Sequence, residues 1–392
     1  MELEPVTGTM TNAGNERAFP ATPRVSIGLP VYNGEAYLDE ALRSLTAQDF
    51  SDFEIIICDN ASTDRTASIA KRWADRDPRI RYFRSDSNIG ANPNFNRAFE
   101  RARGRYFRWA AADDAVNPEY LRRCLTALEA NPGAVLCQSL VQIIDGTGCE
   151  IGIYDGGVRG AELDDAADRF AASVLSRHLC THVFGLVRSD ALRATRLLPD
   201  YYGSDRALLA ELALLGRFVL VPAALFKNRE HPGRGSRAMR SRSKGRGPPI
   251  WNLYVDYWRA ITSHVHDPRD GMRCRLHLLR WWLVDWNYAR LAVELVGSIW
   301  PPLFGWVNRL KVLIYGPLPQ LRTNQIPKLG ARNLSLTESS TAIRNDKDHS
   351  FLDCSLPVGV AKVAERIKPT PAESHDTSVV LAPSSTTKPS PE

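Results

Sequence analysis

Two adjacent carboxylates, Asp113 and Asp114, close an apolar stretch in the segment RYFRWAAADDAVNP. A divalent cation such as Mg2+ or Mn2+ prefers carboxylate oxygens and takes its remaining ligands from substrate phosphates and water, so one or two aspartates suffice. The other interpretation is a solvated turn, which for an acidic loop taken alone is the commoner one. The strands and helices predicted around the two aspartates distinguish between these interpretations.

Those elements alternate short β-branched runs with longer amphipathic runs, which is typical of a mostly parallel sheet covered by helices. We predict strands over residues 24–30, 53–59, 79–84 and 105–111. Helices are expected to begin near residues 35, 64, 90 and 118. Asp59 and Asp113 then lie at or just beyond the C-terminal ends of strands. Ligands of an open α/β sheet bind outside those ends, so both carboxylates should face one cleft.

The domain boundaries follow from changes in composition along the chain. Later runs predict a strand over 134–145 and a helix over 163–178. They also predict a strand that leads into a short helix over 183–199. A further helix is expected from residue 204 to Gly216, and a strand follows it. We expect a disordered segment over 1–23, an α/β domain over 24–230, a basic mobile loop over 231–249, a Trp/Arg-rich helical appendage over 250–319 and a disordered polar tail over 320–392.

Composition limits the classes of protein and of partner. The 392 residues carry a net charge of +6, mostly through arginine, which suits phosphate or acidic lipid partners. The seven cysteines form no C-x-x-C pair, which argues for free thiols in a reducing compartment. The polar N-terminus lacks the apolar core of a signal peptide. We therefore expect a cytoplasmic protein, and the absence of RNA- or DNA-binding motifs argues against a nucleic-acid partner.

Four segments follow one another along the α/β part of the sequence. They are VSIGLPVYNGEAYLDEALRSL, FEIIICDNASTDRT, SNIGANPNFNRAF and WAAADDAVNPEYL. In this order and spacing they resemble the family 2 glycosyltransferases of GT-A fold, and the resemblance covers residues 24–230. It implies a Rossmann-like, mostly parallel sheet between helices. It also implies an enzyme that transfers a sugar, with inversion, from a nucleotide-diphosphate donor to an acceptor hydroxyl in cell-envelope glycan or glycolipid synthesis.

The resemblance also assigns residues to the nucleotide-sugar pocket and to a metal. The pocket residues that it implies are Pro30, Tyr32, Asn33, Asp59 against the base, Asn88, Gly90 and Asp113. The metal motif of the family, Asp-x-Asp, falls on Ala111 and Asp113, so its first carboxylate is missing. Asp113 remains as the ligand of Mg2+ or Mn2+, with Asp114 either assisting or capping the following helix. Asn60, where many members have a second aspartate, is expected to alter a turn rather than the chemistry.

The catalytic base must approach the acceptor oxygen from the face opposite the leaving diphosphate, so it comes from a later segment. The resemblance places it at Asp205 in YYGSDRALLAEL, although members with a Glu-Asp pair have a glutamate where Ser204 stands. The alternative is a first-turn acid favoured by the helix dipole. Glu211 and Glu230 are the secondary candidates for the base.

Three histidines fall near the expected site. His231 precedes Pro-Gly, and the resemblance makes it a ligand of the metal or the diphosphate, the alternative being an ordinary surface histidine. His178 and His182 have the i, i+4 spacing of a helical metal pair. The pattern changes to that of a strand at Val183 and no third ligand is evident, so we expect structural or acceptor-lining roles for this pair.

The Trp/Arg-rich segment over 250–315 lacks the eighteen or so uncharged apolar residues of a spanning helix. Two interpretations stay open, a packed helical appendage and a helix that lies in the membrane interface, where a lipid-linked acceptor would give it a purpose. Two other functions also compete. A nucleotide-sugar- or membrane-binding protein without activity is suggested by Ala111, whereas a nucleotidyltransferase would need a Gly-rich basic loop that LPVYNGEAY does not provide.

Overall fold

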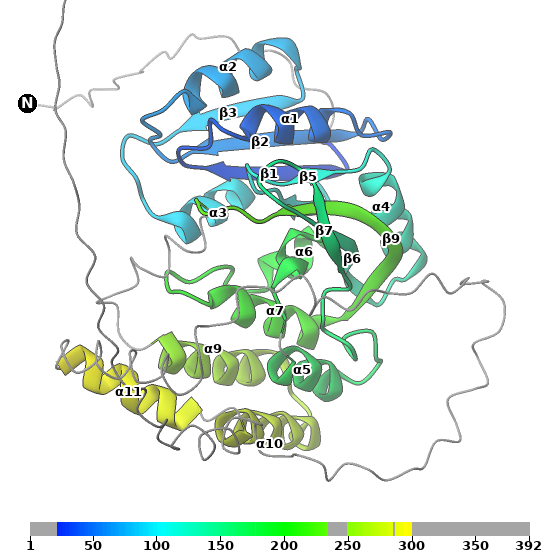
Figure 1. Ribbon diagram of the computed structural model, residues 1–392. Coiled ribbons are helices and arrows are strands. Elements are labelled where there is room, and N and C mark those ends of the chain that lie inside the picture. Colours follow the sequence, from blue (N-terminus) through cyan, green and yellow to red (C-terminus); the bar gives the residue numbers. More distant parts are fainter. Residues whose placement is uncertain (1–21, 177, 234–248, 285–286, 300–392) are drawn as a thin grey trace, which may run out of the picture. The chain divides into compact units, whose positions relative to one another are not determined.

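The computed structural model describes residues 22–176, 178–233, 249–284 and 287–299. Within these ranges the chain forms one nine-stranded sheet in the order β3-β2-β1-β4-β8-β6-β9-β5, with β7 paired to β6. Helices cover this sheet (Figure 1). The predicted α/β fold is confirmed, and the predicted parts of the chain outside these ranges lie beyond the described residues.

The first half of the sheet is parallel and closely follows the sequence prediction. Its strands are β1 (Val25–Val31), β2 (Phe53–Asp59), β3 (Ile80–Arg84) and β4 (Tyr106–Trp109). The helices between them are α1 (Leu38–Thr46), α2 (Thr66–Arg76) and α3 (Ala91–Glu100). Every residue of β1, β2 and β4 is buried, because helices cover both faces of these strands.

Alternate residues of β2 pack against different helices. Ile55 and Ile57 share a core with Leu42 of α1, whereas Ile56 and Cys58 pack against Ala98 of α3. This two-residue period explains why the strand reads as an unbroken apolar run rather than an alternating one. The run ends at Asp59, which is itself buried and is the first polar side chain of the candidate site.

Pro30 lies near the point where β1 and β4 separate. The pairing of β1 with β4 ends at Gly28 opposite Trp109, while the pairing with β2 continues to Val31 opposite Asp59. Backbone groups of alternate residues in a strand point to the same side, so the nitrogen of Pro30 faces the β4 side, as the carbonyl of Gly28 does. Proline is tolerated there because no ladder bond is required. Ligands of such sheets bind where neighbouring strands diverge in this way.

The second half of the sheet mixes parallel and antiparallel pairs. Its elements are β5 (Ala115–Val116), α4 (Tyr120–Ala130), β6 (Ala134–Ile144), β7 (Glu150–Tyr154), α5 (Ala166–Leu175), the 3-10 helix η1 (Thr181–Phe184), β8 (Leu186–Arg188), α6 (Ser189–Arg193), α7 (Ser204–Leu215) and β9 (Arg217–Arg229). The sequence did not predict β5 or β7. The short strand β5 pairs with the end of β9, Val116 lying opposite Phe226. This pairing brings the aspartates before β5 next to the last residues of β9.

Three helices follow the sheet: α9 (Pro249–His264), α10 (Pro268–Val284) and α11 (Asn287–Ile299). Tyr257 and Trp281 from these helices join Phe170 of α5 and Leu214 of α7 in a separate apolar core. The predicted helical appendage is therefore present as far as residue 299 and packs on α5 and α7 (Figure 1). None of the helices in the described ranges is long and apolar enough to cross a membrane.

Candidate active site

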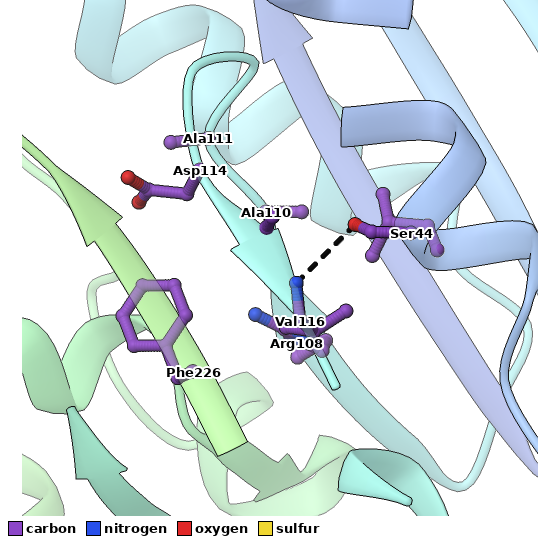
Figure 2. A pocket seen from close by; sticks show the side chains of 9 residues that line it. Ser44, Arg108, Ala110, Ala111, Asp114, Val116 and Phe226 are labelled. Carbon is purple, nitrogen blue, oxygen red and sulfur yellow. Dashed lines mark hydrogen bonds between the residues drawn. The ribbon is translucent and has the colours of Figure 1, made fainter. Parts of the chain in front are cut away.

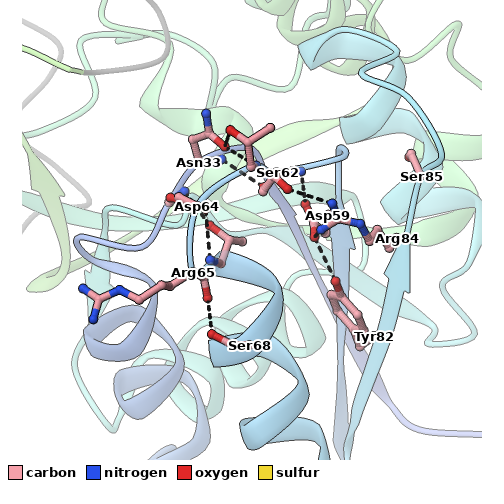
Figure 3. A network of polar contacts seen from close by, with 12 residues as sticks. Asn33, Asp59, Ser62, Asp64, Arg65, Ser68, Tyr82, Arg84 and Ser85 are labelled. Carbon is pink, nitrogen blue, oxygen red and sulfur yellow. Dashed lines mark hydrogen bonds and ion pairs between the residues drawn. The ribbon is translucent and has the colours of Figure 1, made fainter.

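The loops after β1 and β2 are fastened to each other by hydrogen bonds (Figure 3). The Asn33 amide donates to Ser62 Oγ at 3.0 Å, and Asn33 Oδ1 accepts from the Thr63 amide at 2.8 Å. The next amide, that of Gly34, donates to Thr66 Oγ1 at 2.8 Å. Asn33 adopts a positive φ of 51°, which asparagine tolerates better than most residues. The loop that follows β1 is thus held in one conformation at the C-terminal edge of the sheet.

Asp59 is fully buried and both of its carboxylate oxygens have partners within the chain (Figure 3). Oδ1 accepts from the Ser62 amide at 2.8 Å, while Oδ2 accepts from Tyr82 Oη at 2.8 Å and Arg84 Nη1 at 2.7 Å. Burial and the bond to Asp59 raise the pKa of Tyr82 to about 12, so the phenol stays a donor. Asp59 therefore organises this corner, and its contact with a nucleotide base stays a prediction.

Asn60 was expected to alter only a turn, but it holds the segment that contains Asn88 and Gly90. Its Nδ2 donates to Asn88 Oδ1 at 3.0 Å and to the Gly90 carbonyl at 2.9 Å, and its Oδ1 accepts from the Ile89 amide at 2.9 Å. These contacts need a side chain that donates and accepts at once. An aspartate, which is only an acceptor when ionised, cannot make both donor bonds.

The start of α3 ties this segment to the start of α7. Asn92 Nδ2 donates to the Pro199 carbonyl at 2.7 Å, the Tyr201 carbonyl at 3.2 Å and Ser204 Oγ at 2.8 Å. Asn92 lies two residues after Gly90, and Ser204 is the first residue of α7. The structure therefore brings the proposed donor-binding segment close to the helix that carries Asp205.

Asp205 is partly buried in the first turn of α7. Its Oδ1 accepts a 2.9 Å hydrogen bond from the amide of Arg206, the next residue. Burial raises the pKa of Asp205, against the opposing effects of the Arg206 charge and of a hydrogen bond from Cys180. A carboxylate with a raised pKa accepts a proton more readily at neutral pH, which suits a general base.

The secondary candidates for the base differ from Asp205 in their surroundings. Glu211 is buried, and its oxygens face Arg196 and His264: Oε2 accepts from the Arg196 amide at 3.2 Å and Oε1 lies 3.0 Å from His264 Nε2. This carboxylate links α7 to α9, and each of its two oxygens has a partner within the chain. Glu230 donates its amide to the Ile144 carbonyl at 2.8 Å and continues the register of β9.

Asp113 and His231 form a carboxylate–imidazole pair although 118 residues separate them. Asp113 Oδ2 lies 2.9 Å from His231 Nε2, and both side chains are only partly exposed. Two neighbouring ligands of an octahedral ion, each about 2.1 Å from it, stand about 3 Å apart, so this spacing fits a shared Mg2+ or similar ion. Other ligands would come from the substrate and water, because no three potential metal-binding side chains cluster in the described residues.

Arg229 organises this pair and was missed in the sequence. It is almost fully buried, and its Nε donates to the Asp113 carbonyl at 2.8 Å while Nη2 pairs with Glu40 Oε1 at 2.6 Å. The guanidinium also lies 4.6 Å from the ring of Tyr37, whose ring is 4.9 Å from that of His231. Arg229 thereby joins the end of β9, the loop after β4 and the start of α1. The pairing of β9 with β5 and β6 brings Arg229 to these partners, and no local motif signals it.

Asp114 faces a different direction from Asp113. It is buried, its Oδ1 accepts the Arg229 amide at 2.8 Å, and both oxygens accept from Asn228 Nδ2 at 3.1 and 3.2 Å. The interpretation of Asp114 as a helix cap is wrong, because α4 begins at Tyr120 with Glu119 at its cap position. Its oxygens are used to fasten the loop to β9, which leaves Asp113 and His231 as the pair that fits a metal.

Ala111, where the resemblance leads us to expect the first aspartate of a metal motif, lines a small pocket (Figure 2). Asp114 and the buried Arg108 line it together with Phe226. Arg108 stacks 4.4 Å from the centre of the Tyr120 ring, and its Nε and Nη1 have no hydrogen-bond partner among the described residues. The pocket is thus lined by the Asp114 carboxylate and the Arg108 guanidinium. The alanine at position 111 adds no third charge to this lining.

His178 and His182 are buried near the start of α7. His178 Nε2 lies 3.2 Å from the Ser173 carbonyl, and His182 belongs to the 3-10 helix. Burial lowers the pKa of His178 to about 4 and that of His182 to about 3, so both rings are neutral at physiological pH. The His182 ring occupies the space beside Gly156, where an added Cβ would lie 2.3 Å from Cε1. These contacts support structural roles.

Comparisons with known proteins show similarity to glycosyltransferases. The family described as Glycosyl transferase family 2 matches residues 26–162. An uncharacterized glycosyltransferase of Haemophilus influenzae is 28% identical over 221 residues, covering 53% of this chain and 66% of that protein. The GalNAc(5)-diNAcBac-PP-undecaprenol beta-1,3-glucosyltransferase of Campylobacter jejuni is 28% identical over 195 residues, covering 48% of this chain and 60% of that protein. The chain thus spans less than two thirds of the length of these relatives.

Among solved structures, S. aureus TarS in complex with UDP-GlcNAc is similar with a TM-score of 0.50 and 20% identity, over 66% of this chain and 72% of that one. The same protein in complex with UDP gives a TM-score of 0.50 at 18% identity. At this level of identity the likeness shows that the two chains share a fold.

Proposed function

Because the chain belongs to glycosyltransferase family 2 and has the GT-A fold, we propose that it transfers a sugar, with inversion, from a nucleotide-diphosphate donor to an acceptor hydroxyl. The observation that supports the proposal is the presence of two carboxylates with different surroundings. Asp113 is paired with an imidazole that could share a metal, whereas Asp205 is partly buried with a raised pKa. Such a division of roles is what an inverting transfer requires.

We assign the donor to the loops after β1 and β2 and to the Asn88–Gly90 segment. Tyr32 and Asn33 stand exposed at the end of β1, and Asn60 holds Asn88 and Gly90 in place. Pro30 is buried inside β1, so it shapes the loop rather than contacting the donor. A Mg2+ or Mn2+ ion held by Asp113 and His231 would offset charge on the leaving diphosphate.

Asp205 is the proposed base. In the reaction the acceptor oxygen forms its bond to the anomeric carbon while the bond to the diphosphate breaks on the opposite face, and the acceptor proton passes to Asp205. The link from Asn92 to Ser204 keeps this carboxylate next to the donor segment. Removing the proton as the bond forms avoids a charged intermediate on the acceptor oxygen.

The acceptor is proposed to be a glycan or a lipid-linked sugar of the cell envelope. The support is a relative, the Campylobacter jejuni protein, whose name describes transfer to an undecaprenol-linked diphosphate sugar. Cytoplasmic placement at the inner face of the membrane stays a prediction. The donor sugar and nucleotide are to be identified by screening donor hydrolysis against a panel of nucleotide sugars with Mn2+.

The decisive variant is Asp205→Asn, with Glu211→Gln as its control. Asn keeps the oxygen that accepts the Arg206 amide but cannot take up a proton, so transfer should fall at least about a hundredfold while donor binding stays near the parent's. The folded protein holds the Asp205 proton more tightly than the unfolded chain, so the ionised carboxylate lowers stability at neutral pH. Asp205→Asn should therefore melt at or above the parent's temperature.

Glu211→Gln should show the reverse pattern, because it weakens the contacts with Arg196 and His264 and leaves the proposed site intact. We expect a loss of about 1.5–3 kcal/mol of stability, typical for a hydrogen bond to a charged group, with transfer retained. Near-parental transfer by Asp205→Asn would reject the base assignment. Parental protein that binds every donor of the panel and transfers none would favour the inactive binding protein, the alternative suggested by Ala111.

A further inference from the structure

Helix α10 is apolar on two opposite faces. Its inner face, formed by Cys274, Leu278 and Trp281, is buried against α5 and α9. A helix on the surface of a protein normally has one apolar stripe and a polar opposite side, whereas a helix that is apolar all round has apolar partners on both sides. The outer face of α10 therefore requires an explanation.

That outer face carries four apolar side chains, each more than half exposed. They are Met272, Leu276, Leu279 and Leu283. Their spacing of four, three and four residues aligns them in one stripe over three turns, about 16 Å along the helix. The partly exposed Trp258 of α9 lies beside this stripe, because Arg275 of α10 is 5.5 Å from its ring centre.

Charge on these helices is of one sign wherever it is exposed. Within the described parts of α9, α10 and α11 the exposed charged side chains are all arginines: Arg259, Arg269, Arg275, Arg280 and Arg290. The exposed Asp267 lies in the connection before α10, where its carboxylate accepts hydrogen bonds from the Arg269 and Asp270 amides. The acidic residues of the same helices, Asp256, Asp270 and Glu294, are buried or half-buried. Asp165 and Asp168 of α5 are engaged by Arg273 on the other side of α10.

We propose that the outer face of α10, with Trp258 of α9, docks on an anionic lipid bilayer with the helix parallel to the surface. The four apolar side chains enter the boundary between headgroups and acyl chains, while Arg275 and Arg280 extend their guanidiniums to the lipid phosphates. A bilayer fits better than a protein groove because the stripe is long and narrow and the exposed charges along α10 itself are arginines. This surface goes beyond the transfer reaction and does not depend on it.

The test uses the full chain and vesicles of phosphatidylcholine with and without phosphatidylglycerol. The parent should co-sediment with the anionic vesicles and lose binding as salt rises. The double variant Leu276→Glu, Leu279→Glu should abolish binding, and it should melt like the parent because both side chains are exposed and Glu suits a helix. Arg275→Ser, Arg280→Ser should weaken binding to anionic vesicles about thirtyfold, from about 1 kcal/mol for each arginine.

The matched control is Arg43→Ser, Arg159→Ser, which removes the same charge from exposed positions of α1 and the loop after β7. Retained binding in this control supports docking through α10, and an equal loss in both arginine pairs would overturn it. Two further results would overturn it. One is absence of vesicle binding by the parent. The other is a parental dimer in sedimentation velocity that becomes monomeric in the leucine double variant, with no binding to vesicles. Donor binding measured on the same preparations keeps this result separate from the proposed transfer.

Discussion

Removing the Arg229 guanidinium should impair metal-dependent donor binding without touching a proposed ligand. The change is Arg229→Met, which keeps much of the length of the side chain and removes its charge and donors. In the structure Arg229 donates to the carbonyl of Asp113 and pairs with Glu40, and only 2% of its side chain is exposed. Its backbone amide still donates to Asp114 in the variant, so β9 keeps its place.

The expected loss in the free energy of unfolding follows from the burial and charge of each contact that is removed. The buried bond to the Asp113 carbonyl involves a charged donor and is worth about 1.5–3 kcal/mol. The Glu40 pair is half-exposed on the glutamate side and adds at most about 1 kcal/mol. We therefore expect a loss of roughly 2–4 kcal/mol in the free energy of unfolding.

The functional effect should be larger with metal than without it. Partners that orient metal ligands typically change metal affinity by about 10- to 100-fold when removed. Titration calorimetry with a nucleoside diphosphate should show a loss of this size in the presence of Mn2+ and little change without it, measured well below the melting temperature. The control is Arg217→Met at the opposite end of β9, whose partner Asp164 is highly exposed.

Arg217→Met should cost no more than about 1 kcal/mol and leave donor binding unchanged, as expected for a surface pair. Two results would refute the reasoning about Arg229. One is a destabilised variant that keeps its Mn2+-dependent affinity, which would make the arginine a structural residue only. The other is an equal loss of affinity with and without Mn2+, which would place its effect on the nucleotide loops instead.

Three further predictions concern the proposed site. Asp113→Ala should abolish transfer and the Mn2+-dependent part of diphosphate binding, and parental turnover with an unchanged melting curve would contradict this. Burial raises the pKa of Asp205, so this residue becomes protonated at a higher pH than an ordinary aspartate; kcat/KM for transfer should fall on the acid side while calorimetric donor binding stays level. Asn60→Asp should raise the KM for the donor and cost about 1–3 kcal/mol of stability, since the acceptors on Asn88 and Gly90 lose their donor; an unchanged KM would count against it.

The sequence predicted most strands and helices because their signals are local. The apolar run of β2 and the Gly216 that ends α7 are visible within a few residues. The short strand β5 was not predicted, since two residues carry no periodicity, and its existence depends on pairing with β9. A strand that depends on pairing with distant residues is therefore not predicted from local sequence patterns.

The same distinction separates the residues that the sequence proposed for the site from those that it did not. Asp59, Asp113 and Asp205 were proposed because each stands at the end or start of a predicted element and matches the family pattern, and their roles stay predictions. The role of Asn60 was underestimated, and that of Arg229 was not seen, because their partners lie far along the chain. Two roles were left open for Asp114, assisting the metal or capping the following helix, and its contacts with β9 were foreseen by neither, because these partners also lie far along the chain.

In the proposed site, the alanine at position 111 changes how a metal pair would be assembled rather than removing it. In an Asp-x-Asp motif both carboxylates come from one loop, so their spacing is set locally. Here the partner of Asp113 is His231, which follows β9 and is brought to Asp113 by the pairing of β9 with β5 and β6 and by the contact of Arg229 with the loop. A metal that binds this pair binds only the folded chain, so its binding free energy also stabilises the β5–β9 junction. Loss of one local carboxylate is therefore compatible with the proposed catalysis, provided that the long-range contacts around Arg229 are intact.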